Sequence, residues 1–372
     1  MKQRKDQAGI DGENDAERIA LKVFYGEFVF SDLWYSNKEV GLETNIELAD
    51  LIINLGNNFL AFQVKTRKGT PVDGGDKKWV ANKVKKAKDQ LVETYKNLQI
   101  GGLPEFVNKK NDKIFLEKEG VFSGIIILKN EGVVEYPKII ECKRLKGIIH
   151  CFTEKDFNTC CERLVIPSDI LKYLYYRERY YELDKEILEE ETICIDGFLK
   201  ETYGVTEFDN NAVESFKWIL NKFKDRLVEK NRGSIEYRAI VQVLAMFNRT
   251  EIDTFTNIFA KLLNGARKNQ FTDHMFMKPV DVKKYSILFL SMGELDIEHA
   301  KRVTHLFMYR VRSDKCLTVI LHMEDDINFE IYWLLIERPW EKDIGMESLI
   351  KELGIQNKWI PKKIITGKLE RN

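Results

Sequence analysis

The sequence lacks any long hydrophobic run, and no stretch approaches the roughly 18 apolar residues that a membrane-spanning helix needs. Its 59 basic and 59 acidic residues leave no net charge, so any attraction to nucleic acid must come from a local patch. No internal repeat or low-complexity segment stands out. These absences predict an ordinary globular protein that does not enter membranes.

The six cysteines include no Cys-x-x-Cys pair, the spacing typical of zinc and redox sites. The adjacent Cys160 and Cys161 are therefore expected to fill the core rather than to bind a metal. The first residues are charged rather than apolar, which argues against a signal peptide. We expect reduced thiols and a cytoplasmic location.

A chain of 372 residues is expected to form more than one domain. A change of character after a strongly acidic run predicts a first domain at 1–190, a linker at 191–209 and a second domain at 210–372. The second domain has the pattern of three helices followed by an α/β block of unassigned fold. No motif in it carries chemistry, so a sensor, targeting or oligomerisation role is assigned by exclusion.

The segment 46–69 organises the first domain. Two apolar stretches, 48–54 and 59–65, flank Gly56-Asn57-Asn58, whose residues tolerate positive φ, so the sequence predicts a β-hairpin. Buried positions in such a hairpin favour apolar side chains, and a buried charge costs several kcal/mol unless it is paired or bound to a metal. The polar residues within the hairpin therefore need an explanation.

Those polar residues are Asp50, Gln63 and Lys65. The two-residue period of a strand places Gln63 and Lys65 on one face, and alignment with Asp50 would bring a carboxylate, an amide and an ammonium together. With the backbone carbonyl of Val64, these oxygens suit Mg²⁺ or Mn²⁺, and Lys65 could stabilise charge on a phosphate. The alternative is a buried Asp50–Lys65 ion pair with a structural role alone.

The pattern of Asp50 followed by Gln63-Val64-Lys65 resembles the core of the PD-(D/E)xK nuclease superfamily. The glutamine in the acidic position is similar to the variant of Mrr-type restriction endonucleases. Residues 9–13, Gly-Ile-Asp-Gly-Glu, resemble the GxxGE opening of nuclease-related, NERD-like domains. The helix that follows resembles the glutamate-bearing first helix of Holliday-junction resolvases.

This resemblance implies a restriction-endonuclease-like mixed sheet flanked by helices, and an Mg²⁺- or Mn²⁺-dependent endonuclease. Asp11 is a favoured N-cap residue and predicts a helix to about Tyr25. The helix dipole accounts for an acid at Glu13 better than at Glu17, which lies on the buried side. We therefore expect Glu17 to join Asp50, Gln63 and Lys65 as a catalytic residue and metal ligand, with Glu13 as a further candidate ligand.

A basic, amphipathic helix is predicted at 77–98, directly after the hairpin. The residues expected to contact nucleic acid there and in the preceding loop are Arg67, Lys83, Lys86 and Gln90. A lysine-rich face that is merely solvated is the alternative. Glu47, before the hairpin, is expected to be a solvated side chain.

Further strands are predicted at 121–128, 139–142 and 147–152, with His150 as a core residue. The tyrosine-rich segment 173–181 is expected to form an interdomain or subunit surface, through which the chain could form a homodimer or bind a partner protein.

Two functions from different classes follow. The first is a metal-dependent nuclease acting on nucleic acid, expected to be DNA, in bacterial restriction or antiphage defence by analogy with the families that the motifs resemble. The second is an inactive module with a nuclease fold that binds nucleic acid or a protein partner. The neutral Gln63 is the feature that favours the second.

Overall fold

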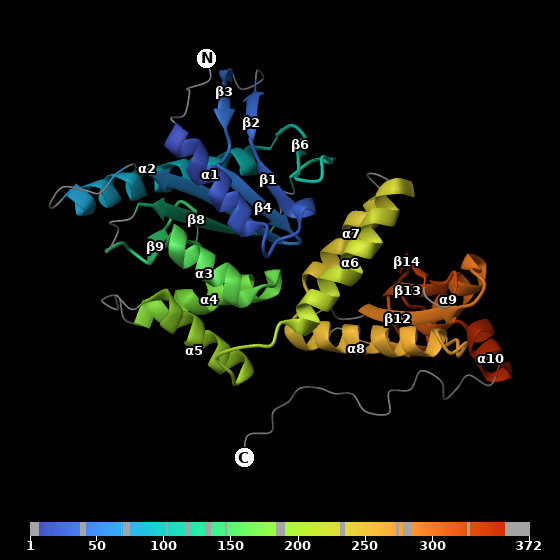
Figure 1. The fold of residues 1–372 in the computed structure, drawn as a ribbon. Coiled ribbons are helices and arrows are strands. Elements are labelled where there is room, and N and C mark those ends of the chain that lie inside the picture. The colour runs from blue at the N-terminus through green and yellow to red at the C-terminus, as the bar shows by residue number, and fades with distance from the viewer. Residues whose placement is uncertain are drawn as a thin grey trace. The chain divides into compact units, whose positions relative to one another are not determined.

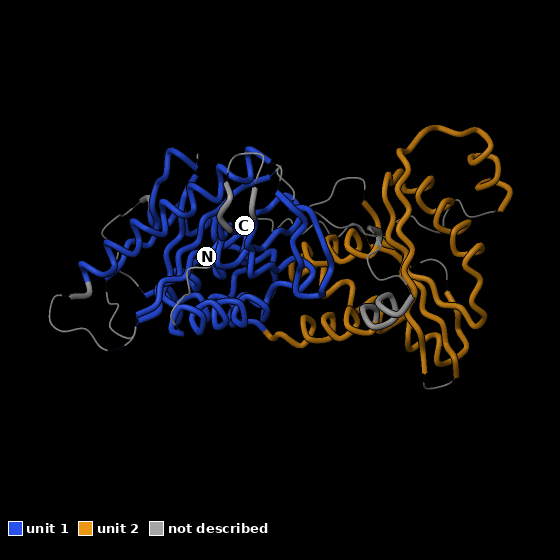
Figure 2. The backbone as a smooth tube through the Cα atoms, turned by 90° about the horizontal axis from the view of Figure 1, so that it is seen from above, with its two compact units in different colours: residues 1–208 blue, residues 209–372 orange. Residues whose placement is uncertain are grey.

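The computed structural model describes residues 7–37, 42–67, 69, 75–101, 103–116, 120–130, 135–145, 147–183, 190–230, 235–272, 275–277, 285–325 and 328–353. The chain divides into two compact units, residues 1–208 and 209–372, which Figure 2 shows in two colours. Both are built from helices and strands, as predicted. Among the described residues, no helix combines the length and the apolar character that crossing a membrane requires.

The elements of the first unit are, in chain order, α1 (Gln7–Ala20), η1 (Gly26–Phe28), β1 (Val29–Ser31), β2 (Trp34–Asn37), β3 (Leu42–Glu47), β4 (Leu51–Leu55), β5 (Asn58–Thr66), α2 (Gly75–Ile100), β6 (Phe106–Val107), β7 (Lys113–Ile114), β8 (Val121–Lys129), β9 (Ile139–Cys142), β10 (Gly147–Thr153), α3 (Glu154–Leu164), α4 (Pro167–Leu183) and α5 (Glu191–Tyr203). Those of the second unit are α6 (Asn211–Lys230), α7 (Ile235–Ala245), α8 (Arg249–Ala266), β11 (Met275–Met277), β12 (Tyr285–Met292), α9 (Ile297–Val311), β13 (Lys315–Met323), β14 (Phe329–Glu337) and α10 (Ile344–Glu352).

A mixed sheet forms the centre of the first unit, with the strand order β1-β4-β5-β8-β10-β9 (Figure 1). Strands β5, β8 and β10 run parallel, whereas β1, β4 and β9 pair antiparallel with their neighbours. The near-continuous apolar sequence of β8 fits a strand that is covered on both faces. The strands predicted at 121–128, 139–142 and 147–152 are therefore confirmed as β8, β9 and β10.

The predicted hairpin is also confirmed. Strands β4 and β5 pair antiparallel across Gly56 and Asn57, and Gly56 has a φ of 57°. Val121 N donates to Asn57 O at 2.7 Å, which ties the turn to the start of β8. At Gly120, a Cβ atom would lie 2.3 Å from Asn57 O, so only glycine allows this approach.

The helices α1 and α3 cover one face of the sheet and α2 covers the other (Figure 1). Phe62 contacts Phe157 of α3, with 5.6 Å between ring centroids, whereas Ala61 belongs to a core cluster with residues of α2. Alternation along β5 therefore turns Gln63 and Lys65 towards the side of α2.

Helix α1 differs from the prediction. It is helical from Gln7 and ends at Ala20, so Asp11 lies inside the helix and accepts from Gln7 Nε2 at 2.8 Å. The reason is the contact of Gly12 with β5: a Cβ atom there would lie 2.2 Å from Thr66 Oγ1. Burial of Ala8 and Gly12 extends the buried stripe one turn earlier than the capping residue suggests.

The predicted linker at 191–209 is wrong, because residues 191–203 form α5 within the first unit. Arg177 of α4 is fully buried, and its Nε donates to Glu191 Oε1 at 2.6 Å. Burial alone would raise the pKa of Glu191, but its contacts with Arg177, Lys138 and Tyr173 together outweigh burial and lower that pKa. This pair fixes the first residue of α5 to the unit's core.

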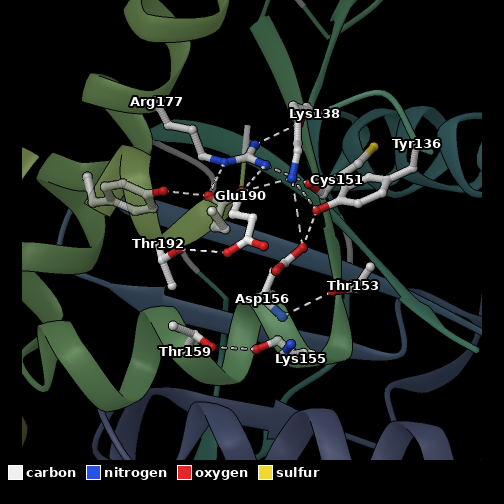
Figure 3. Close-up of polar contacts among 12 residues, drawn as sticks. Tyr136, Lys138, Cys151, Thr153, Lys155, Asp156, Thr159, Arg177, Glu190 and Thr192 are labelled. Atoms are coloured by element: carbon white, nitrogen blue, oxygen red, sulfur yellow. Dashed lines mark hydrogen bonds and ion pairs between the residues drawn. The ribbon is translucent and has the colours of Figure 1, made fainter. Parts of the chain in front are cut away.

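Arg177 is also bound to the sheet. Its Nη1 donates to Lys138 O at 2.6 Å and its Nη2 to Cys151 O at 2.7 Å, as Figure 3 shows. In the same view Lys138 Nζ donates to the Tyr136 hydroxyl at 2.8 Å, and that hydroxyl donates to Asp156. Balanced charges and satisfied hydrogen bonds make this a structural network that holds α4 on β9 and β10.

The tyrosines of α4 are divided between core and surface. Tyr173 and Tyr181 are buried, and the Tyr173 hydroxyl donates to Glu191, whereas Tyr175 is exposed. The prediction that 173–181 forms an interdomain or subunit surface is therefore wrong for Tyr173 and Tyr181.

Cys160 and Cys161 are buried in α3, as predicted, and burial raises the pKa of both thiols.

In the second unit, a sheet with the strand order β11-β12-β13-β14 packs with helices. Strands β12 and β13 are parallel and are connected through α9, whereas β13 and β14 form an antiparallel hairpin. The predicted order of three helices followed by an α/β block is confirmed, because α6, α7 and α8 precede this sheet and α9.

Candidate metal centre

The polar residues of the hairpin meet where β4 begins and β5 ends. Asp50 directly precedes β4, and its Oδ2 accepts from the backbone N of Val64 at 2.7 Å. Lys65 Nζ donates to Gln63 Oε1 at 2.8 Å and to Val64 O at 3.1 Å. The same nitrogen lies 3.6 Å from Asp50 Oδ2. The carboxylate, amide and ammonium thus converge as the sequence predicts.

This convergence is shielded from water. The side chains of Lys65 and Asp50 are only 11% and 5% exposed, and Gln63 is buried. The same geometry is found in structural ion pairs and in catalytic sites. The groups that surround the Asp50–Lys65 pair are therefore needed to distinguish the two interpretations.

Two further acids lie beside Asp50. One carboxylate oxygen each of Glu13, Glu47 and Asp50 lie within 4.8 Å of one another. They come from three elements: the first half of α1, the last residue of β3 and the segment before β4. Three carboxylate oxygens at this separation could coordinate one ion, so the cluster has the donor set of a cation site.

The expected preference for Glu17 over Glu13 does not fit this geometry. Glu17 Oε2 lies 2.8 Å from Lys109 Nζ, in an ion pair outside the cluster. Because Gly12 packs against Thr66 at the end of β5, the neighbouring Glu13 reaches Asp50. Glu17 lies one helical turn further along α1.

Glu47 is the functional candidate that the sequence analysis missed. It precedes the hairpin, and the sequence predicts only a solvated side chain there. The signal that could have identified it is its spacing, three residues before Asp50, at the end of a strand that leads into the hairpin. This spacing places a second acid on the same segment as the first.

No protein-family model, curated protein or solved structure matched the chain. Functional assignment therefore depends on the chemistry of the residues themselves.

The donors fit a hard divalent cation. Carboxylate oxygens are the ligands that Mg²⁺ and Mn²⁺ prefer, and the cluster contains no thiol or imidazole that would favour zinc or copper. The other expected ligands, Gln63 Oε1 and Val64 O, both accept from the Lys65 ammonium. The residues that could hold the ion are therefore Glu13, Glu47 and Asp50.

A second set of charges fixes α1 beside the cluster. Lys129, at the end of β8, pairs with Asp15 of α1, and its Nζ lies 2.9 Å from Glu154 of α3. The hydrogen bond from Lys129 lowers the pKa of Asp15. Because Asp15 is two residues from Glu13, this bridge helps to hold the acid-bearing part of α1 against the sheet.

The residues expected to bind nucleic acid lie on β5, α2 and the loop between them. Arg67 follows β5, and its backbone N donates to Lys129 O at 3.1 Å. On α2, Lys83 is half-buried, Lys86 is exposed and Gln90 is half-buried. One turn later, the Thr94 hydroxyl donates to Leu48 O, which ties α2 to the segment that carries Asp50.

Proposed function

We propose that the chain is a divalent-metal-dependent nuclease of the PD-(D/E)xK type that hydrolyses DNA phosphodiester bonds. The observation that carries the proposal is the position of Lys65 Nζ, 3.6 Å from Asp50, whose carboxylate also belongs to the cluster with Glu13 and Glu47. A cation site beside a buried lysine would provide two positive charges that can stabilise the transition state of phosphodiester hydrolysis.

The sheet order supports the same assignment. Helix α1, the antiparallel β4–β5 hairpin, helix α2 and the parallel strand β8 follow one another along the chain, and the acids and the lysine lie on α1 and the hairpin or directly before it. This order agrees with the mixed sheet that the sequence motifs imply.

Each residue has a distinct role in the proposal. Glu13, Glu47 and Asp50 hold the cation, which when bound polarises the phosphate and makes a water molecule more acidic. Lys65 stabilises negative charge on the phosphate oxygens, and its low exposure strengthens that interaction. Lys83, Lys86 and Arg67 contact neighbouring phosphates, so binding weakens as salt concentration rises. A role in restriction or antiphage defence follows by analogy with the resembled families.

One observation favours the second function, an inactive module that binds nucleic acid or a protein. The position occupied by an acid in most of the superfamily is Gln63, and its oxygen accepts from Lys65. A site without this acid could bind DNA without cutting it.

Incubating the full chain with plasmid DNA in Mg²⁺ or Mn²⁺ tests the proposal. We expect strand scission that stops with a chelator and falls by at least about 100-fold in Asp50→Asn and Lys65→Ala, because Asp50 holds the cation and Lys65 stabilises the negative charge of the transition state. Lys85→Ala, an exposed change on α2, is the matched control and keeps full activity. Plasmid binding without metal-dependent scission would instead support the binding module.

A further inference from the structure

The Gln63 side chain is directed at the lysine. Its Oε1 lies 2.8 Å from Lys65 Nζ, which is shorter than the distance from that nitrogen to Val64 O or to Asp50. Gln63 is 3% exposed, so bulk water does not compete for this hydrogen bond. The amide thus holds the ammonium inside the sheet.

The same amide oxygen is poorly suited to bind a divalent ion at the same time. A cation coordinated by Gln63 Oε1 would share that atom with an ammonium only 2.8 Å away from it. Two positive charges this close repel strongly in a water-poor site. The carboxylates of Glu13, Glu47 and Asp50 offer an alternative, because one oxygen of each lies within 4.8 Å of the others. Of these, Asp50 Oδ2 lies 3.6 Å from Lys65 Nζ, further from the ammonium than Gln63 Oε1 does.

Charge also favours glutamine at position 63. The site already contains three carboxylates and one ammonium. A fourth carboxylate would add a buried negative charge, whereas a neutral amide supplies a hydrogen-bond acceptor without that cost.

We propose that Gln63 is a positioning residue that holds the Lys65 ammonium, and that Glu47 supplies the third carboxylate of the cation site in place of residue 63. This inference rests on the proposed function. In this assignment the motif's acidic residue is replaced by two residues with separate roles: Gln63 holds the lysine and Glu47 binds the ion.

Manganese binding to the full chain, measured without DNA by titration calorimetry or by the electron paramagnetic resonance of free Mn²⁺, tests the assignment of the ligands. We expect Gln63→Met to keep the Mn²⁺ dissociation constant within about twofold, and Glu47→Gln to raise it at least about tenfold. Glu17→Gln, at the other glutamate of α1, is the matched control and leaves the dissociation constant unchanged. Equal weakening by Gln63→Met and Glu47→Gln, or no effect of Glu47→Gln, overturns the assignment.

The reactivity of lysines tests the positioning role independently of activity. Labelling Lys65 with a small acylating reagent, read by mass spectrometry, should rise severalfold in Gln63→Met and stay low in Gln63→Glu, which keeps an acceptor. Lys138 is the internal control, because its side chain is also 11% exposed. Unchanged labelling of Lys65, or an equal rise at Lys138, contradicts the positioning role.

The two proposals fail in different ways. If the wild-type chain cuts no DNA, the nuclease proposal fails, while Mn²⁺ binding and lysine labelling still decide the role of Gln63. If the chain does cut, Gln63→Met should lower the scission rate about 10- to 100-fold at saturating Mn²⁺, and Gln63→Glu should restore most of it.

Discussion

At the scale of single residues, the buried imidazole of His150 makes stability depend on pH. The residue is fully buried, and its Nε2 lies 3.2 Å from Glu178 Oε1. Burial lowers the pKa of His150 from its ordinary value of 6.5, and the contact with Glu178 only partly opposes this. The unfolded chain therefore binds a proton first as the pH falls, and the free energy of unfolding decreases below pH 6.5.

His150→Phe should remove this dependence while keeping an aromatic ring beside Phe152. Urea unfolding at pH 7 and pH 5.5 measures this pH dependence. Between these values the free energy of unfolding of the wild type should fall by at most about 1.4 kcal/mol per pH unit more than that of the variant. His299→Gln, at an exposed position, is the control. The same slope in the wild type and in His150→Phe would contradict the prediction.

Gln90 offers a separate test of DNA contact. Its Oε1 is buried and has no hydrogen-bond partner among the described residues. A buried acceptor without a partner costs about 1–3 kcal/mol, so Gln90→Met should not lower the free energy of unfolding. DNA binding should nevertheless weaken severalfold, as measured by fluorescence anisotropy, with the exposed Gln99→Met on the same helix as control. A loss of stability with unchanged DNA affinity would refute the role.

The sequence predicts part of this site for a clear physical reason. Asp50, Gln63 and Lys65 belong to one hairpin, so strand periodicity and a short turn are enough to bring them together. Glu13 and Glu47 reach Asp50 through long-range packing of α1 and through the end of β3. Neither is fixed by local pattern, and the choice between Glu13 and Glu17 depends on where α1 contacts β5.

At the scale of elements, Gly12 sets the distance between α1 and β5. A Cβ atom at this position would lie 2.2 Å from Thr66 Oγ1. Gly12→Ala should therefore lower the free energy of unfolding by about 1–3 kcal/mol, although alanine favours helices over glycine. It should also weaken Mn²⁺ binding, because Glu13 moves with α1.

Thr66→Ala supplies the control, since it removes the hydroxyl that the new methyl group would meet. Thr66 Oγ1 has no hydrogen-bond partner among the described residues, so its loss alone should cost little. In the Thr66→Ala background, Gly12→Ala should be neutral or stabilising, as a double-mutant cycle in urea would show. Additive effects of the two changes would contradict the close contact.

Helices and strands with a strong hydrophobic periodicity are predicted well from the sequence, whereas elements whose limits depend on long-range contacts are not. Strand β8 and helices α6 and α8 carry unmistakable apolar patterns. Strands β1 and β2, by contrast, are separated at Asp32, which has a φ of 55°. A left-handed residue of this kind has no reliable local signal when it is not glycine.

At the scale of the whole molecule, the limits of the first unit can be tested by truncation. A chain ending at residue 208 keeps α5, whereas one ending at 190 leaves Arg177 buried without Glu191. Removing one partner of a buried ion pair costs about 3–5 kcal/mol, and the apolar face of α5 is lost as well. Because domains are stable by only about 5–15 kcal/mol, the fragment 1–190 should be largely unfolded.

Circular dichroism and limited proteolysis compare the two fragments. The fragment 1–208 should unfold cooperatively, and Glu191→Gln in the full chain should reproduce part of the loss. Equal stability of the two fragments would show that α5 is dispensable. The sequence predicts the end of the linker at residue 209, close to the division of the chain, but assigns the residues of α5 to the linker because the chain changes character after the acidic run.

The closeness of the three carboxylates has a thermal consequence. In the proposed site, a divalent ion bound by the carboxylates of Glu13, Glu47 and Asp50, whose oxygens lie within 4.8 Å of one another, would stabilise the folded state relative to the unfolded chain. Calcium or manganese should therefore raise the melting temperature of the first unit even when no substrate is present. In Lys65→Ala, which lacks the compensating ammonium, the ion should raise the melting temperature more than in the wild type. Thermal unfolding with and without the ion therefore measures the charge balance of the site.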